Sequence, residues 1–377
     1  MFNFQFKRNS NTFLFLIINP IAIGFLFLIL LASCSIQKQL SKSATQLVLK
    51  DSSLLTAHVG ISIYEPAANK YWYNYQGDKY FTPASNTKLP TCYAAMKYLG
   101  DSLVGLRYQD QDNQLIIQGA GDPTFLNREF QVQRVFEFLK KAQKPIVWDY
   151  YNWRDEYLGS GWSWNDYNDD YMAGRSALPL FGNVLELFGK RADLHITPPI
   201  IFSYQYEGGN DLYLSNVLRE KESNRFSFEF KGETKRILHV PFLTMNGEVN
   251  KKILSDTLHK KIIPQDDFIP ATAGDRDVTV IHSQPTDSLL KPMMHRSDNF
   301  FAEQSLLMVS NERLGVMNDE KIIDTLLKTD FKDLPQKPRW VDGSGLSRYN
   351  LFTPQDFVSI LTKIKKEFGM GRIKNIL

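Results

Sequence analysis

The sequence predicts an α+β protein in which a β-rich region interrupts a more helical domain. Apolar and aromatic side chains alternate along residues 59–75 around the turn-forming segment EPAANK, a pattern typical of a β-hairpin. Short β-like runs such as QLIIQG and RFSFEF follow between residues 113 and 264. Helical spacing of apolar residues returns near residue 300 and dominates the end of the chain, where Thr353 is a candidate cap and Pro354 a first helical residue.

The composition is that of a globular protein without a strong charge preference. The chain has 377 residues, of which 43% are hydrophobic and 13% aromatic, enough for two or three domains and a sizeable core. Its formal net charge of +3 becomes +1 when Lys7 and Arg8, the only charged residues of segment 1–33, are removed. A nearly neutral chain of this kind does not predict nucleic acid as a partner.

Metal and cofactor sites are not predicted. The six histidines are never closer than thirteen residues, the separation of His282 and His295, so no two-histidine helical zinc motif exists. The two cysteines, Cys34 and Cys92, form no Cys-x-x-Cys motif, and Cys92 stands among residues where a buried thiol is expected. Neither a nucleophile elbow nor a phosphate-binding glycine loop occurs in the sequence.

The N-terminal segment predicts export and a membrane anchor. Two basic residues precede an apolar run over residues 13–31, the pattern of a secretory signal peptide covering residues 1–33. The ending Leu-Ala-Ser-Cys resembles the lipobox of bacterial lipoproteins, which implies that Cys34 receives lipid and becomes the first mature residue. The alternative is a single membrane-spanning helix, because the run approaches the width of a bilayer. Both interpretations place the rest of the protein outside the cytoplasm, in the periplasm, with residues 34–56 as a tether and lead-in.

A Ser-x-x-Lys pattern, Ser85 to Lys88 in the segment FTPASNTKLP, is the first candidate for chemistry. Serine is a poor nucleophile at neutral pH, so it needs a base within hydrogen-bond reach, and residues three apart on a helix share one face. Lysine can act as that base only if burial or a neighbouring positive charge lowers its pKa. The same spacing occurs at residues 35–38 and 288–291, so a polar, solvated helix start is the alternative explanation.

The Ser-x-x-Lys pattern does not stand alone. Besides PASNTK at 83–88, the chain contains HRSDNFFAE at 295–303 and VDGSGLSRYNLFTP at 341–354. Together these segments resemble the class C penicillin-binding proteins, the D-alanyl-D-alanine carboxypeptidase/endopeptidase family. The resemblance implies an α/β sandwich with the penicillin-binding transpeptidase, or serine β-lactamase-like, fold and no cofactor. It implies that residues 57–112 and 265–377 form this domain, with residues 113–264 as an inserted β-rich region.

The resemblance also assigns roles to four side chains. Ser85 would attack the carbonyl between the two D-alanines of a peptidoglycan stem peptide, and Lys88 would take its proton. Ser297 would relay a proton to the leaving amine, and Asn299 would bind the substrate's amide. β-Lactams would acylate the same serine. Spacing alone is weak support, because a second Ser-x-Asn pair occurs at 163–165, and a helix cap would also account for the pair at Ser297.

The sequence departs from the family at its third motif, Lys-Thr-Gly. The nearest string, Lys328-Thr329-Asp330, precedes the Asp-Gly-Ser-Gly segment at 342–345, whereas the family's motif follows that segment. In the family the missing strand supplies one N–H of the oxyanion hole, and losing such a donor costs on the order of 10² to 10³ in rate. We expect the natural chain to continue past Leu377 into this strand, and the 377-residue form to be poorly stable and to release little D-alanine. The 342–345 segment is expected to be a structural turn, because its serine has no base three residues on.

Two functions from different classes follow from these patterns. The first is a lipid-anchored serine D-alanyl-D-alanine carboxypeptidase/endopeptidase that acts on peptidoglycan peptides. The second is a non-catalytic lipoprotein that uses the same scaffold to bind cell-wall peptide or another protein. Acylation by a labelled penicillin separates the two.

Cys34→Ser is expected to move the mature protein from the membrane to the soluble fraction, because the thiol that would carry the lipid is lost. Cell fractionation followed by immunoblotting measures this change. Persistent membrane attachment of the variant would instead support a spanning helix over residues 13–31.

Overall fold

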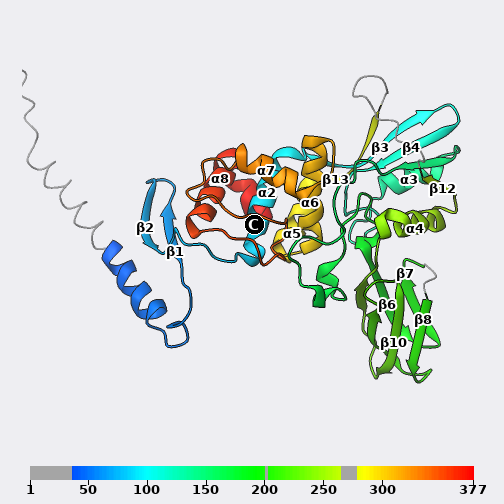
Figure 1. Ribbon diagram of the computed structural model, residues 1–377, viewed down its shortest axis with the longest axis horizontal. Helices are drawn as coiled ribbons and strands as arrows, with labels where there is room; N and C mark the ends of the chain where they lie inside the picture. The colour runs from blue at the N-terminus through cyan, green and yellow to red at the C-terminus, as the bar shows by residue number, and fades with distance from the viewer. Residues whose placement is uncertain (1–35, 200–202, 265–277) are drawn as a thin grey trace, which may run out of the picture. The chain divides into compact units, whose positions relative to one another are not determined.

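The computed structural model describes residues 36–199, 203–264 and 278–377 (Figure 1). The predicted signal peptide and the predicted lipidation site Cys34 therefore lie outside the described residues. Within the described ranges, no helix combines the length and the apolar character that crossing a membrane requires.

The first of two compact units, Met1–Gly77, contains a helical stretch and a β-hairpin. Residues 36–44 are helical and run into η1 (Thr45–Leu49), a π-helical turn. β1 (Ile61–Glu65) pairs antiparallel with β2 (Lys70–Tyr75). This pairing confirms the hairpin that the alternating pattern predicts.

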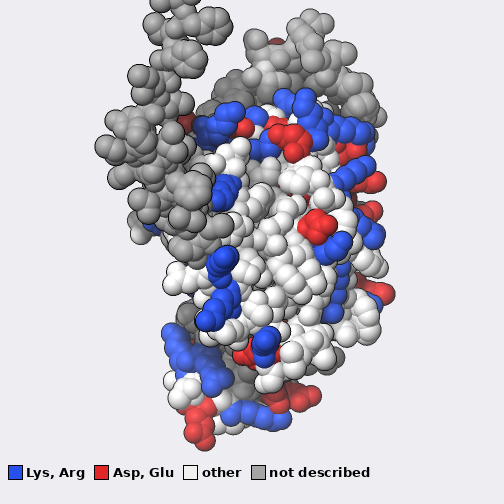
Figure 2. Space-filling model, turned by 90° about the vertical axis from the view of Figure 1, so that its left-hand side faces the viewer, with Lys and Arg blue, Asp and Glu red and all other residues white. Residues whose placement is uncertain are grey.

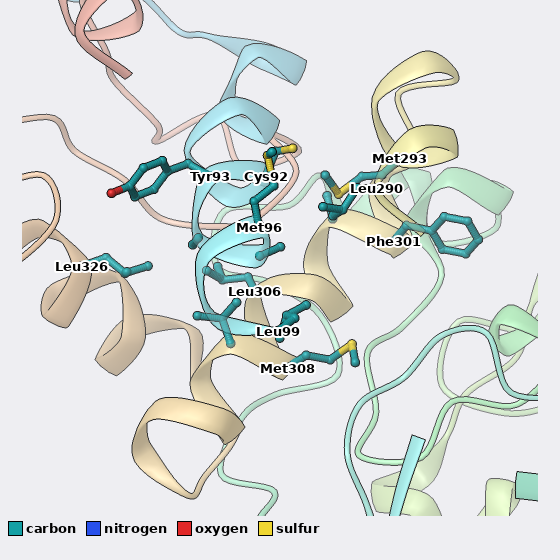
Figure 3. Close-up of a cluster of buried hydrophobic side chains, with 14 of the residues drawn as sticks. Cys92, Tyr93, Met96, Leu99, Leu290, Met293, Phe301, Leu306, Met308 and Leu326 are labelled. Atoms are coloured by element: carbon teal, nitrogen blue, oxygen red, sulfur yellow. The ribbon is translucent and has the colours of Figure 1, made fainter. Parts of the chain in front are cut away.

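The second unit, Asp78–Leu377, contains a group of helices and two larger sheets (Figure 1). Its principal helices are α2 (Lys88–Tyr98), α5 (Thr286–His295), α6 (Asn299–Leu314), α7 (Asp319–Lys328) and α8 (Pro354–Ile376). α6 is buried along most of its length and shares one apolar cluster with the other four helices. Met96 of α2, Met293 of α5 and Leu306 of α6 are among the side chains of this cluster in Figure 3. Packing against α6 therefore fixes α2, which begins at Lys88, directly after the turn that carries Ser85.

Cys92 lies within the same apolar cluster (Figure 3). Its thiol is free and fully buried. Burial raises the pKa of Cys92 to about 12, so the sulfur stays protonated at neutral pH. The residue is the small buried apolar group that the sequence predicts.

The start of α8 has the predicted cap. The Thr353 side chain accepts a hydrogen bond from the Asp356 N–H (3.1 Å), and the Asp356 carboxylate accepts one from the Thr353 N–H (2.9 Å). This capping box satisfies two N–H groups that have no partner within the helix. Pro354 occupies the first helical position, where its missing N–H costs nothing.

A five-stranded sheet has the strand order β12-β5-β4-β3-β13. Its members are β3 (Ser102–Gln111), β4 (Gln114–Gly119), β5 (Ile146–Asp149), β12 (Ile262–Pro264) and β13 (Thr279–Pro285). β3 pairs antiparallel with β4 and β13, whereas β5 is parallel to β4 and β12. α3 (Arg134–Lys141) makes the crossover from β4 to β5. β3 and β13, outside the predicted 113–264 region, thus share a sheet with three strands from inside it.

A second sheet has the order β11-β6-β9-β10-β8, with β7 paired to β6. Its members are β6 (Val184–Lys190), β7 (Asp193–Thr197), β8 (Ser203–Gly208), β9 (Tyr213–Arg219), β10 (Arg225–Gly232) and β11 (Leu238–Pro241). Phe226, Phe228 and Phe230 alternate along β10 and are fully buried, as the RFSFEF pattern predicts. These rings join a second apolar cluster with α4 (Glu248–Leu258) and with side chains of the five-stranded sheet.

Charged side chains of both signs are mixed on the face shown in Figure 2. Lys and Arg side chains lie beside Asp and Glu side chains, with uncharged residues between them. Neither sign of charge therefore covers this face continuously.

Candidate active site

Ser85 lies exposed on a tight turn at the start of α2. The turn is a short 3-10 helix, η2 (Ala84–Thr87), and Ala84 has a φ of +46°. Non-glycine residues in this left-handed region cost on the order of 1 kcal/mol and persist where surrounding contacts enforce them, often at functional sites. Because α2 begins only at Lys88, Pro90 falls within its first turn, where no N–H is needed. The local backbone thus presents the Ser85 hydroxyl to solvent and turns Lys88 inward.

Lys88 is almost completely buried, with 1% of its surface exposed. Its Nζ lies 3.2 Å from Ser85 Oγ, 2.6 Å from Asn299 Oδ1 and 2.9 Å from the Ser344 carbonyl oxygen. The structure therefore brings together three of the four side chains that the sequence predicts for the site. It adds a backbone carbonyl as a further partner of the lysine.

Burial lowers the pKa of Lys88 to about 8, because the charged ammonium loses its hydration. The negative charges of Glu303, Asp298 and Asp342 act in the opposite direction and limit the fall. A substantial fraction of Lys88 is therefore uncharged at mildly alkaline pH, whereas an ordinary lysine is fully protonated there.

The three partners suit both protonation states of Lys88. As an ammonium, Nζ has three N–H donors, and each has an acceptor: Ser85 Oγ, Asn299 Oδ1 and the Ser344 carbonyl. As a neutral amine, Nζ keeps two donors for Asn299 and Ser344 and offers a lone pair to the Ser85 hydroxyl. A proton can move between Ser85 and Lys88 while the other two hydrogen bonds stay in place.

The Asp-Gly-Ser-Gly segment at 342–345 forms one wall of the lysine site. The Thr91 hydroxyl donates to the Gly343 carbonyl (2.7 Å), which joins the segment to α2. Gly345 has a φ of +92°, and a Cβ placed there would lie 1.9 Å from the Ala84 carbonyl oxygen. The segment is the structural turn that the sequence predicts, but it also supplies an acceptor to Lys88, which the sequence does not reveal because a carbonyl has no side-chain signature.

Asp342 holds this segment in shape from inside. Its buried carboxylate accepts hydrogen bonds from the Trp162 indole (3.0 Å), the Gly345 N–H (2.9 Å) and the Ser347 N–H (2.6 Å). The Asn350 side chain donates a further bond of 2.7 Å. These bonds compensate the burial of the charge and fix the loop around the Ser344 carbonyl.

Asn299 and Glu303 project from one face of α6, because they are one helical turn apart. The Asn299 side-chain amide accepts from Lys88 through Oδ1 and donates through Nδ2 to the Tyr171 carbonyl (3.1 Å). Glu303 Oε1 accepts from the Ser344 N–H at 2.8 Å. Glu303 was not among the predicted site residues, although its spacing from Asn299 is a signal that could have indicated it.

Ser297 occupies the turn before α6 and is exposed. Its φ is +59°, so Ser297, like Ala84, is a non-glycine residue in the left-handed conformation. Among the contacts of the described residues, no hydrogen bond joins Ser297 to Ser85 or Lys88. The cap of α6 is Asp298, whose carboxylate accepts from the Phe301 N–H (2.9 Å).

Two cavities meet at Asn299 and Tyr171, which line both. The cavity that contains Ser85 has a volume of about 400 Å³, and the one that contains Ser297 has about 640 Å³. The first is lined by Thr82, Ala84, Ser85, Ser163, Asp166, Tyr171, Met172, Asn299, Gly345, Leu346 and Arg348. Ser163, from the other Ser-x-Asn pair, thus also lies at the nucleophile's cavity. Among the described residues, no group of three or more His, Cys, Asp or Glu side chains could hold a metal ion.

Comparison with known proteins places the chain in a family. The profile of the D-Ala-D-Ala carboxypeptidase 3 (S13) family matches residues 41–194 and 248–377, and the chain belongs to this family. Penicillin-sensitive carboxypeptidase A of Dictyostelium discoideum is 22% identical over 355 residues, which cover 77% of this chain and 65% of that protein. The chain therefore spans less than two thirds of this relative's length.

Two solved structures share the fold. The crystal structure of penicillin-binding protein 4 from Haemophilus influenzae is 20% identical to this chain in sequence. The match covers 84% of this chain and 77% of that protein's chain, with a TM-score of 0.63. The structure of the same protein with a β-lactam is 19% identical to this chain. Here the match covers 84% of this chain and 76% of that protein's chain, with a TM-score of 0.57. The likeness confirms the predicted fold class, an α+β penicillin-binding-protein fold with an inserted β-rich region.

Gly345→Ala is expected to destabilise the protein more than Gly315→Ala does. Both glycines have positive φ, +92° and +71°, so alanine costs about 1 kcal/mol of backbone strain at either position. Only at Gly345 would the new Cβ also collide with the Ala84 carbonyl, whereas no described atom lies within 4 Å at Gly315. Urea denaturation of the two variants measures the difference in unfolding free energy. Equal losses would show that the 342–345 segment does not press against the turn of Ser85.

Proposed function

We propose that this protein is a serine-type D-alanyl-D-alanine carboxypeptidase/endopeptidase that acts on peptidoglycan stem peptides and is acylated by β-lactams at Ser85. The observation that carries the proposal is the contact between a buried lysine and an exposed serine, Lys88 Nζ to Ser85 Oγ at 3.2 Å. Membership of the S13 family and the penicillin-binding-protein fold support the same reaction class.

The proposed reaction begins with an uncharged Lys88. Ser85 Oγ bonds to the carbonyl carbon between the two D-alanines while its proton passes to Lys88 Nζ. The C–N bond breaks, the leaving amine of the terminal D-alanine takes a proton, and an ester remains on Ser85. Water then hydrolyses the ester, which releases the shortened peptide and restores the Ser85 hydroxyl. The lowered pKa of Lys88 supports this role, because it supplies neutral amine near physiological pH.

The remaining predicted residues keep their proposed roles. Asn299 binds the substrate's amide, and its place on both cavities and beside Lys88 supports this role. Ser297 relays the proton to the leaving amine, from a turn two residues before Asn299. That relay needs substrate or water between the two serines, because Ser297 makes no direct bond to Ser85 among the described contacts.

We also propose that the protein works outside the cytoplasm, held at a membrane through lipid on Cys34. The proposal rests on the lipobox-like Leu-Ala-Ser-Cys ending of the apolar N-terminal segment. A peptidoglycan substrate suits this location, because the cell wall lies on the outer side of the cytoplasmic membrane.

Ser85→Ala is expected to abolish covalent labelling of the protein by a fluorescent penicillin, because the acylated oxygen is absent. Lys88→Ala is expected to slow labelling by about a hundredfold or more, since the hydroxyl then keeps its proton. Fluorescence of the denatured protein after gel electrophoresis measures both effects.

The matched control is Ser288→Ala, which removes an exposed serine with the same Ser-x-x-Lys spacing in α5 and should label normally. Labelling that survives in Ser85→Ala would contradict the assignment of the nucleophile. Failure of the unaltered protein to label would favour the non-catalytic binding lipoprotein.

A further inference from the structure

Glu303 is a buried carboxylate that the proposed reaction does not use. It is 1% exposed and lies one turn into α6, beside apolar side chains of the principal cluster. Glutamate is almost never buried in this way unless its charge is paired, because an ionised carboxylate loses several kcal/mol of hydration. Its position therefore requires specific partners.

The two oxygens of Glu303 have different partners. Oε1 accepts from the Ser344 N–H at 2.8 Å, and Oε2 lies 3.4 Å from Nη1 of Arg175. Arg175 is also 1% exposed and pairs with Asp319 at 2.6 Å and Asp155 at 2.8 Å. Glu303 thus connects a buried guanidinium to the backbone of the segment that touches Lys88.

Ser344 is consequently fixed on both sides. Its N–H is held by Glu303, and its carbonyl accepts from Lys88 Nζ at 2.9 Å. Asn299, one turn earlier on α6, bonds to the same Nζ. Two of the three hydrogen bonds of the lysine are therefore controlled from one helix face, one directly and one through Ser344.

We propose that Glu303 is a positioning residue for the Ser85–Lys88 pair. Braced by Arg175, its carboxylate fixes Ser344 so that the Ser344 carbonyl holds Lys88 Nζ against Ser85 Oγ. The inference rests on the proposed function, because it assigns Glu303 to the geometry of the same nucleophile.

Charge adds a second link between Glu303 and Lys88. Burial raises the pKa of Glu303 to about 8, and Asp342 and Asp319 act in the same direction, while Arg175 opposes them. As Glu303 ionises near this pH, its negative charge favours the ammonium form of Lys88, together with the charges of Asp298 and Asp342. Removing the Glu303 charge should therefore make Lys88 lose its proton at lower pH.

Two substitutions separate the hydrogen bond from the charge. Glu303→Gln keeps an oxygen acceptor for the Ser344 N–H and removes the charge, whereas Glu303→Ala removes both. We expect Glu303→Ala to lower the maximal rate constant of acylation by a fluorescent penicillin by about ten- to a hundredfold, with little change in the half-saturating concentration. Glu303→Gln should restore that rate to within a few fold, with the acidic limb of its pH profile moved to lower pH.

The protonation of Lys88 can also be followed without catalysis. NMR titration of the protein labelled with ¹³Cε-lysine, with the Lys88 signal identified by its loss in Lys88→Arg, gives the midpoint directly. Glu303→Gln should lower this midpoint measurably. The matched control is Glu312→Gln, which removes a carboxylate from the same helix where it pairs with Arg107 at 2.6 Å, and which should leave the midpoint unchanged.

The outcomes separate this inference from the proposed function. If the unaltered protein is not acylated, the proposed function fails, and the Lys88 midpoints still decide whether Glu303 acts on the lysine. Equal midpoints in the unaltered protein and Glu303→Ala overturn the inference, because that variant loses both the hydrogen bond and the charge. So does a Glu303→Ala protein that is acylated at the original rate, or a Glu303→Gln protein as slow as Glu303→Ala. Recovery of the acylation rate in Glu303→Gln also separates positioning from a general loss of stability, because an equal loss of stability would slow both variants equally.

Discussion

The rest of the site depends on the three hydrogen bonds of the buried Lys88 amine. A buried ammonium without partners is unstable, so three oxygen atoms must converge on one nitrogen. They come from the turn of Ser85, from α6 through Asn299 and from the 342–345 segment through Ser344. The fold must therefore hold three distant parts of the chain within hydrogen-bond distance of a single atom.

Several features of the fold follow from this requirement. The burial of α6 in the principal apolar cluster gives Asn299 a rigid base, and the same cluster holds α2. Glycine at 345 allows the loop to approach the Ser85 turn, which no side chain would permit. The predicted insert takes part as well, because the Tyr171 carbonyl accepts from Asn299 and the Trp162 indole donates to Asp342. The nucleophile is thus positioned by packing and backbone geometry as much as by its own motif.

The parts that the sequence predicted are local in origin. The hairpin, the RFSFEF strand and the Thr353 cap each follow from side-chain spacing within a short stretch of sequence, which sets secondary structure directly. Ser85 and Lys88 are one turn apart, but spacing could not show that Lys88 is buried or that Asn299 meets it, since these depend on tertiary packing. The family resemblance supplied Asn299. The Ser344 carbonyl and Glu303 were not predicted, because a backbone acceptor leaves no mark in the sequence and a glutamate on a helix is usually exposed.

The proposed chemistry of Ser85 depends most directly on a lowered pKa for Lys88 in the folded protein, and the pH dependence of stability tests this pKa. The measurement is the unfolding free energy of the protein and of Lys88→Met between pH 7 and 11. With a folded pKa of about 8 and an ordinary value of 10.5, the unfolded chain binds more protons than the folded one within that window. The protein should therefore gain stability relative to Lys88→Met as the pH rises from about 8 to 10.5, and show no relative change below pH 8. A difference between the two that stays constant across the whole range would contradict the lowered pKa of Lys88.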